Sequence, residues 1–373
     1  MSGFQPRLTR RGALFAGAAA GGLGWSHAAS AQDQDAALAE AVDAYVRRVM
    51  AAWPDQPAVG VAVVRDGRTV MTRGYGVKRR GSDDPANEHT QFAVASNTKA
   101  MTVALLARKV DAGELEWDAP VRTYLPDFTL SDPFISERIT VRDLVSHRAG
   151  FGLGAGDLLF WPNSDRTRAE IMAAIPHVPI EYGFRAGYHY CNLMFVVAGA
   201  VIERLYGAPY EVVLRHELMD ALHMAGSGPM TSLASPTHAA LPHGRIGPPL
   251  RYQGDMTLLS ETIPGIWNWD SAAAAGGVIA TPHDWASWIH VQLNQGRTMT
   301  GVRLWSEDQA REMWRPNIIS GSSPGPTDEM PNRAIASTYA MGWAVQDYRG
   351  ERIVNHGGGS PGGISSTFLI PGR

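Results

Sequence analysis

The order of strand-like and helix-like segments along this 373-residue chain is the feature that most restricts its fold. Residues 59–64 and 69–72 are apolar stretches joined by an Asp-Gly turn, which predicts an early β-hairpin. Helical patterns broken by Pro/Gly loops predict a mostly helical subdomain over about 114–264. Strand-like alternation returns late, at 339–348, 352–355 and 364–370. We therefore expect an α+β fold of the α/β-sandwich type, in which both chain ends build one antiparallel sheet flanked by helices and the helical subdomain is inserted.

Periodic apolar positions predict individual helices on both sides of these strands. The clearest patterns lie at 35–51, 97–111, 193–206 and 282–294. Gly113 follows the second of these helices closely enough to form its C-terminal cap.

The first thirty-one residues have the order of an export signal. A twin-arginine pair, Arg10 and Arg11, precedes an apolar run at 13–23, and residues 29–31 supply a small-residue cleavage pattern. The run is too short to span a bilayer, so we expect no stable membrane span after cleavage. The alternative is an uncleaved interfacial helix. The sequence thus predicts a domain over 32–373 that is exported, either to the periplasm or to the medium.

Charge and cysteine content exclude several classes of protein. The formal net charge is -3, and beyond the N-terminal segment there is no Lys/Arg-rich run, so we expect no nucleic-acid partner. Cys191 is the only cysteine, so no intramolecular disulfide can form. A catalytic thiol is possible in principle, but a small apolar filler explains Cys191 more simply.

Ser96-Asn97-Thr98-Lys99 is the only Ser-x-x-Lys sequence in the chain. Residues three apart share a helix face, so Ser96 and Lys99 should touch at the start of the predicted helix. The positive end of the helix dipole favours the serine oxygen and disfavours a charge on Lys99, and a neutral lysine can take the serine proton. The alternative is a capping serine beside a solvated lysine.

Tyr190-Cys191-Asn192 is the only Tyr-x-Asn sequence and precedes the predicted helix at 193–206. A phenol near Ser96 could pass a proton to a leaving group. The Asn192 amide could orient Lys99 or hold a substrate carbonyl. A core tyrosine with Asn192 as the helix cap is the alternative.

The third motif, His356-Gly357-Gly358-Gly359, follows the predicted strand at 352–355. Glycines there would let a substrate lie against the backbone, and their N–H groups could polarise a carbonyl oxygen. A glycine-rich hairpin turn is the alternative interpretation.

In this order, the three motifs resemble the serine β-lactamase-related family, which contains class C β-lactamases, D-alanyl-D-alanine carboxypeptidases and β-lactamase-fold esterases. Other segments similar to the family lie at 113–121, 124–126, 139–150, 275–281 and 341–343. The resemblance covers nearly the whole chain after residue 31 and implies a β-lactamase/transpeptidase-like fold.

The same resemblance implies an acyl-enzyme mechanism that needs neither metal nor cofactor. Ser96 would attack a carbonyl, Lys99 and Tyr190 would move protons, and water would release the acyl group. Substrate binding would fall to Asn192, His356 and Gly358, and the backbone N–H groups of Ser96 and Gly359 would hold the oxyanion. His147 matches a structural position of the family.

Two features depart from the family pattern. Gly357 replaces the usual threonine, whose hydroxyl helps to hold a substrate carboxylate. We therefore expect a small ester, amide or peptide substrate, and an esterase or D-amino-acid peptidase rather than an efficient β-lactamase. The family also continues through one more strand and a closing helix, whereas this chain ends at Arg373. We expect either a longer parent chain or another cap over the sheet; the alternative function is a non-catalytic or slowly acylating penicillin-binding sensor or scaffold.

Overall fold

The computed structural model describes residues 30–161, 164–229, 237–247, 253–262, 268–330 and 333–372. Helix α1 (Ala31–Ala52) begins at a capping box in which the side chains of Ser30 and Asp33 each accept the other residue's backbone N–H. This confirms the helix expected at 35–51. The export signal predicted for residues 1–31 lies outside the described residues, apart from Ser30 and Ala31, and remains a prediction.

The predicted hairpin is confirmed as β1 (Ala58–Arg65) and β2 (Arg68–Gly76), with an Asp-Gly turn at positive φ. The late strands form a five-stranded antiparallel sheet in the order β12-β11-β10-β9-β8. Its strands are β8 (Ile318–Ser322), β9 (Ala336–Tyr339), β10 (Ala344–Tyr348), β11 (Glu351–Ser360) and β12 (Gly363–Leu369). The stretch expected as one strand at 339–348 is thus divided between β9 and β10, because Gly342 turns the chain at a φ of 69°.

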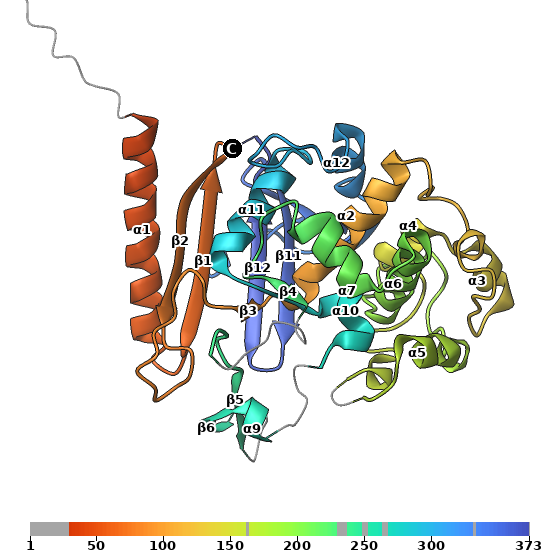
Figure 1. The fold of residues 1–373 in the computed structure, drawn as a ribbon, viewed down its shortest axis with the longest axis horizontal. Helices are drawn as coiled ribbons and strands as arrows, with labels where there is room; N and C mark the ends of the chain where they lie inside the picture. The colour runs from red at the N-terminus through yellow and green to blue at the C-terminus, as the bar shows by residue number, and fades with distance from the viewer. Residues whose placement is uncertain are drawn as a thin grey trace, which may run out of the picture.

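The prediction that strands from both chain ends pair in one sheet is wrong, because the hairpin and the late strands form two separate sheets. Within the described residues β1 and β2 pair with each other alone, and β12 pairs only with β11. Both groups of strands pack instead on helix α11 (Pro282–Leu293), which contacts the hairpin and donates from Trp285 Nε1 to Thr367 Oγ1 of β12 at 3.1 Å. In the view of Figure 1, the hairpin stands between α1 and strands β11 and β12. The α+β class, with helices around antiparallel sheets, is confirmed.

The inserted subdomain is helical up to Met219. It contains α3 (Pro133–Arg138), α4 (Val141–Val145), α5 (Arg168–Ala174), α6 (Leu193–Tyr206), α7 (Tyr210–Val213), short 3-10 turns at Val121–Thr123, Asp157–Leu159 and Ile175–His177, and a π-helix at Leu214–Met219. The described chain then changes to β4 (Gly228–Pro229), β5 (His243–Gly247) and β6 (Gln253–Leu258), followed by α9 (Leu259–Thr262). From Gly228 to Thr262 the described residues are therefore mostly strand, with one short helix, since glycines punctuate the β5–β6 hairpin and disfavour helix.

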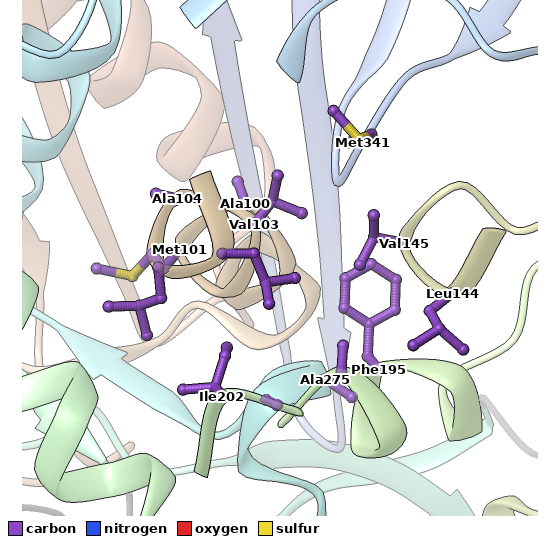
Figure 2. Close-up of a cluster of buried hydrophobic side chains, with 14 of the residues drawn as sticks. Ala100, Met101, Val103, Ala104, Leu144, Val145, Phe195, Ile202, Ala275 and Met341 are labelled. Carbon is purple, nitrogen blue, oxygen red and sulfur yellow. The ribbon is translucent and has the colours of Figure 1, made fainter. Parts of the chain in front are cut away.

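Helix α2 (Thr98–Asp111) is the centre of the molecule. Its residues from Thr98 to Ala107 are all buried, so the helix is covered on every side. Figure 2 shows Met101 and Val103 of α2 near Phe195 and Ile202 of α6, with small alanines on the same helix. Helices α10 (Ala273–Gly276) and α12 (Glu307–Met313) also pack on α2. This burial fixes the start of α2, where the Ser-x-x-Lys motif lies.

A membrane-spanning helix must be both long enough and apolar enough to cross the bilayer. None of the described helices meets both requirements alone, whereas α6 and the segment Tyr210–Met219, which meet at a 72° bend, do so as a pair.

Candidate active site

Ser96 lies in a tight turn between a short strand and the central helix. Strand β3 (Phe92–Ala93) pairs with β7 (Val278–Ala280), and the one-turn 3-10 helix Ala95–Asn97 then leads into α2. Ala95 has a φ of 47°, a left-handed conformation that is uncommon for a residue with a side chain. The turn leaves Ser96 partly exposed while the following residues are buried.

Lys99 is fully buried and its Nζ makes three contacts. It lies 3.0 Å from Ser96 Oγ, 2.8 Å from Asn192 Oδ1 and 2.7 Å from the Ala275 carbonyl oxygen. Burial lowers the pKa of Lys99 to about 7, although the negative charge of Asp157 opposes this shift. The Asn192 and Ala275 oxygens can only accept, so they take the two N–H groups of a neutral amine. The amine lone pair then faces the Ser96 hydroxyl.

Tyr190 completes the contacts of the serine. Its hydroxyl donates to Ser96 Oγ at 2.8 Å. Burial raises the pKa of Tyr190, so the phenol keeps its proton near neutral pH. Ser96 can therefore accept a hydrogen bond from Tyr190 while it donates to Lys99. The structure thus brings together the residues of two motifs that lie 94 positions apart in sequence.

Asp157 is a neighbour of this site that the sequence motifs did not indicate. Its Oδ2 accepts from Asn192 Nδ2 at 3.1 Å, which fixes the orientation of the Asn192 amide toward Lys99. Asp157 Oδ1 is buried and has no hydrogen-bond partner in the described part of the chain, and burial raises the pKa of this carboxyl group. A single acidic residue in the glycine-rich loop at 150–157 was the available signal.

The glycines of the third motif lie inside strand β11, which corrects the expectation that they follow a strand. Strand β10 covers β11 only as far as Asn355, whereas residues 356–360 pair with β12 alone among the described strands. These backbone hydrogen bonds keep the glycines extended, and the hairpin turn comes later, between Ser360 and Gly363. The uncovered edge of β11 is where the strand contacts the Ser96 turn.

Gly358 is the glycine that this contact requires. A β-carbon at Gly358 would lie 2.3 Å from the Val94 carbonyl oxygen and 3.1 Å from the Ser96 nitrogen. A β-carbon at Gly359 would meet nothing within 4 Å, and one at Gly357 would meet only the Ser365 carbonyl oxygen, at 3.9 Å. Close backbone approach is therefore needed at only one of the three positions.

His356, which is expected to bind substrate, lines the pocket at Ser96, and its ring is held by contacts within the protein. Its Nε2 is 2.9 Å from the Tyr339 hydroxyl, and its Nδ1 is 2.5 Å from the Gly357 carbonyl oxygen. Burial lowers the pKa of His356 to about 3, so the ring is neutral. Both ring nitrogens have protein partners, and the side chain holds the strand and Tyr339 in place.

Cys191 and His147 are buried and hold the segment that contains Tyr190 in place. The Cys191 backbone N–H donates to His147 Nδ1 at 3.1 Å, and the His147 ring centroid is 4.2 Å from that of Tyr190. Burial raises the pKa of the Cys191 thiol to about 12, so the thiol remains protonated. These contacts favour a packing role for Cys191 and a structural role for His147.

The fold and the site together define the class of serine-dependent β-lactamase-fold proteins, in which Ser-x-x-Lys, a tyrosine and a glycine strand meet. The family model described as Beta-lactamase matches residues 42–373. The chain belongs to this family, which confirms the resemblance inferred from the motifs.

Individual relatives extend the comparison. The chain is 30% identical to unguisins hydrolase ungD' of Aspergillus campestris over 84% of its own length and 56% of that protein. It therefore spans little more than half of that relative. It is 27% identical to penicillin-binding protein 4 of Amycolatopsis lactamdurans over 85% of this chain and 78% of the relative. The structure of an octameric penicillin-binding protein homologue from Pyrococcus abyssi matches 89% of this chain and 70% of that one, with a TM-score of 0.71 and 20% identity.

Proposed function

We propose that this protein is a serine hydrolase that cleaves an ester or amide through an acyl-enzyme on Ser96. The observation that carries the proposal is the pair of contacts at Ser96 Oγ, with Lys99 Nζ at 3.0 Å and the Tyr190 hydroxyl at 2.8 Å. A buried lysine with a pKa of about 7 is a base near neutral pH, and Tyr190, whose raised pKa keeps the phenol protonated, carries a proton that it can give to a leaving group.

The reaction has two balanced steps. Lys99 takes the Ser96 proton while Oγ forms a bond to the substrate carbonyl carbon, and the backbone N–H groups of Ser96 and Gly359 stabilise the oxyanion. The bond to the leaving group then breaks, and the leaving group departs with a proton from Tyr190, which Lys99 replaces. In the second step water attacks the acyl carbon and gives one proton to Lys99 and Tyr190. The bond between the acyl carbon and Ser96 Oγ then breaks, and Oγ takes up that proton.

Gly357 supports an ester, amide or peptide without a carboxylate beside the scissile bond. No hydroxyl is present at this position to bind a carboxylate. Esterase or D-amino-acid peptidase activity is therefore favoured over efficient β-lactam hydrolysis. The match to a relative named a hydrolase supports the assignment of this protein as a hydrolase.

Intact-protein mass spectrometry tests this proposal. The protein is mixed with a short-chain p-nitrophenyl ester and, separately, with a cephalosporin, while product release is followed by absorbance. We expect an adduct on Ser96 and rapid ester turnover, both abolished by Ser96→Ala, with little cephalosporin loss. A stable adduct without product release would instead support the sensor or scaffold alternative. Full ester turnover by Ser96→Ala would overturn the mechanism.

We also propose export through the twin-arginine route, on the basis of Arg10, Arg11 and the apolar run that follows them. Fractionation of cells that express the full chain tests this. Replacing both arginines with lysine should retain the protein in the cytoplasm. Unchanged export of that variant would refute the proposal.

A further inference from the structure

The pocket at Ser96 continues across the five-stranded sheet toward its edge. It has a volume of about 580 Å³. Beyond the serine, its wall includes one polar residue from each of four strands, namely Asn355 of β11, Gln346 of β10, Ser337 of β9 and Ser320 of β8. Neighbouring strands are about 4.8 Å apart, so three strand spacings give this row a length of roughly 14 Å. The row extends well beyond the atoms that react with Ser96.

Strand register places Asn355, Gln346 and Ser337 on a common surface. Gln346 is directly opposite Ser337, and Asn355 is directly opposite Ala344, which lies two residues from Gln346 along β10. Side chains two residues apart on a strand share a face, and directly paired residues point the same way. Asn355, Gln346 and Ser337 therefore form a continuous strip. Ser320 lies at the irregularity between Ile319 and Gly321, where β8 pairs with β9, and lines the same pocket at the end of this strip.

The described lining carries no formal charge. None of its residues is Asp, Glu, Lys or Arg, and the one histidine, His356, is neutral because burial lowers its pKa to about 3. Across the strip, hydroxyl and carboxamide groups offer both donors and acceptors. Such a surface suits a ligand that is polar but uncharged, since an unpaired charge placed there would lose its hydration.

The groups in the strip also have unused hydrogen-bonding capacity. Neither the Gln346 amide nor the Ser337 hydroxyl bonds to another described residue, and Asn355 Nδ2 is shielded from solvent without a partner there. Gln346 and Ser337 are only partly buried and line the pocket, so their polar groups can bond to the C=O and N–H groups of a ligand. Primary amides match peptide groups particularly well, because both have one C=O acceptor and N–H donors.

We infer that this strip, from Asn355 to Ser320, is a substrate subsite for an uncharged peptide chain that continues beyond the scissile bond. The inference rests on the proposed hydrolase function. About four extended residues cover 14 Å at roughly 3.4 Å per residue. The substrate is thus an ester or amide within a neutral peptide rather than one beside a terminal carboxylate.

Matched substrates test the subsite. Four esters share one scissile bond: one unextended, one extended by an uncharged tetrapeptide amide, one by the same tetrapeptide with a free carboxylate, and one by a disaccharide. Each extension is made on the acyl side and on the leaving-group side. We expect the tetrapeptide amide to raise kcat/KM about tenfold over the unextended ester on one side, and the carboxylate and disaccharide to give smaller gains.

Variants at Gln346 connect this gain to the strip. Gln346→Leu, which keeps the size, should lower the extended-to-unextended ratio about fivefold, because one or two hydrogen bonds are lost. Gln346→Lys should shift the preference toward the carboxylate substrate. Asp347→Asn changes the next residue, which is exposed and outside the pocket lining, and should leave the ratio unaltered. An unchanged ratio in Gln346→Leu, or preference for the disaccharide, would overturn the inference.

A binding measurement separates this inference from the hydrolase proposal. Calorimetry on Ser96→Ala protein reports binding of the free tetrapeptide amide without turnover. We expect binding that Gln346→Leu weakens about fivefold in the Ser96→Ala background. Turnover of the unextended ester without peptide binding would refute the subsite alone, whereas binding without any ester turnover would refute the hydrolase proposal alone.

Discussion

Gly358 lies so close to Ser96 that a β-carbon on the glycine would stand 3.1 Å from the serine nitrogen. The same carbon would be 2.3 Å from the Val94 carbonyl oxygen, which is backbone and cannot rotate away. Gly358→Ala must therefore push β11 away from the serine turn. We expect kcat/KM for the p-nitrophenyl ester to fall by about 100-fold, as small displacements of reacting groups do.

Gly321→Ala is the matched control for that change. It adds the same carbon to β8 of the same sheet, where the nearest atom, Ser337 Oγ, is 3.6 Å away. Thermal unfolding of both variants distinguishes a local displacement from loss of the fold. Wild-type activity in a folded Gly358→Ala protein would contradict the close approach.

Gly357 is, by contrast, a position where a side chain fits. A β-carbon there meets only the Ser365 carbonyl oxygen, at 3.9 Å. Gly357→Thr should place a hydroxyl in the pocket, since Gly357 lines it. A hydrogen bond to a carboxylate is worth about 1.5–3 kcal/mol, so kcat/KM for a carboxylate substrate should rise at least about tenfold relative to its amide analogue. The measurement compares kcat/KM for each carboxylate substrate, a cephalosporin or an ester, with kcat/KM for its amide analogue. If Gly357→Thr leaves this ratio unaltered, the missing hydroxyl does not determine the preference against carboxylate substrates.

Asp143 connects helix α4 to the segment before Tyr190. Its buried carboxylate lies 2.5 Å from Arg148 Nε and 2.6 Å from Arg185 Nη2. Burial alone would raise the pKa of Asp143, but hydrogen bonds from Arg185 and Thr140 outweigh burial and lower it. Asp143→Ala should therefore reduce the free energy of unfolding by about 3 kcal/mol, because it leaves two arginines without their shared partner.

Urea unfolding at several pH values measures this loss. A carboxyl group whose pKa is lowered on folding stabilises the folded state at pH values above its unfolded-state pKa of about 3.9. This stabilisation is lost as the pH falls through the folded-state pKa. The difference between wild type and Asp143→Ala should thus narrow below about pH 4. Asp308→Ala, which removes an exposed ion pair with Arg311, is the control and should cost under about 1 kcal/mol. Equal losses in both variants would contradict the special role of the buried carboxylate.

Local sequence was sufficient for contacts that depend on short spacing. Three-residue spacing on a helix brings Ser96 and Lys99 together, and the Asp-Gly turn closes the β1–β2 hairpin. The family pattern added Tyr190, which no local spacing could place beside a serine 94 residues away. Side-chain periodicity says which residues form a strand but not which strand is its neighbour, and the single sheet was wrong for that reason.

Two parts of the site depend on tertiary packing alone. Glycine has high turn propensity, so the sequence could not show that residues 357–359 stay extended; pairing with β12 decides it. Asp157 contacts Asn192 only because the loop at 150–157 packs near the start of α6, and the Asp157 carboxylate belongs to no motif. The contact between the His356 ring and the Tyr339 hydroxyl likewise comes from tertiary packing.

Asp157 should shift the pH at which kcat/KM begins to rise. Lys99 must be neutral to take the Ser96 proton, so kcat/KM should rise with pH through a pKa near 7. The negative charge of Asp157 raises the pKa of Lys99, which opposes the larger effect of burial. Asp157→Asn removes that charge but retains an oxygen that can accept from Asn192. We therefore expect the acid limb of the kcat/KM profile to move to lower pH, by about half a unit to one unit.

Asp165→Asn removes the same charge from an exposed residue eight positions further along the chain and is the control. Because water screens an exposed charge, its acid limb should stay at the wild-type pH. Asp157→Leu adds a second comparison, since it removes both the charge and the partner of Asn192 and should also lower the pH-independent kcat/KM. An acid limb at the wild-type position in Asp157→Asn, with ester turnover retained, would show that Asp157 does not act on Lys99. A shift to higher pH would mean that the negative charge acts through another group.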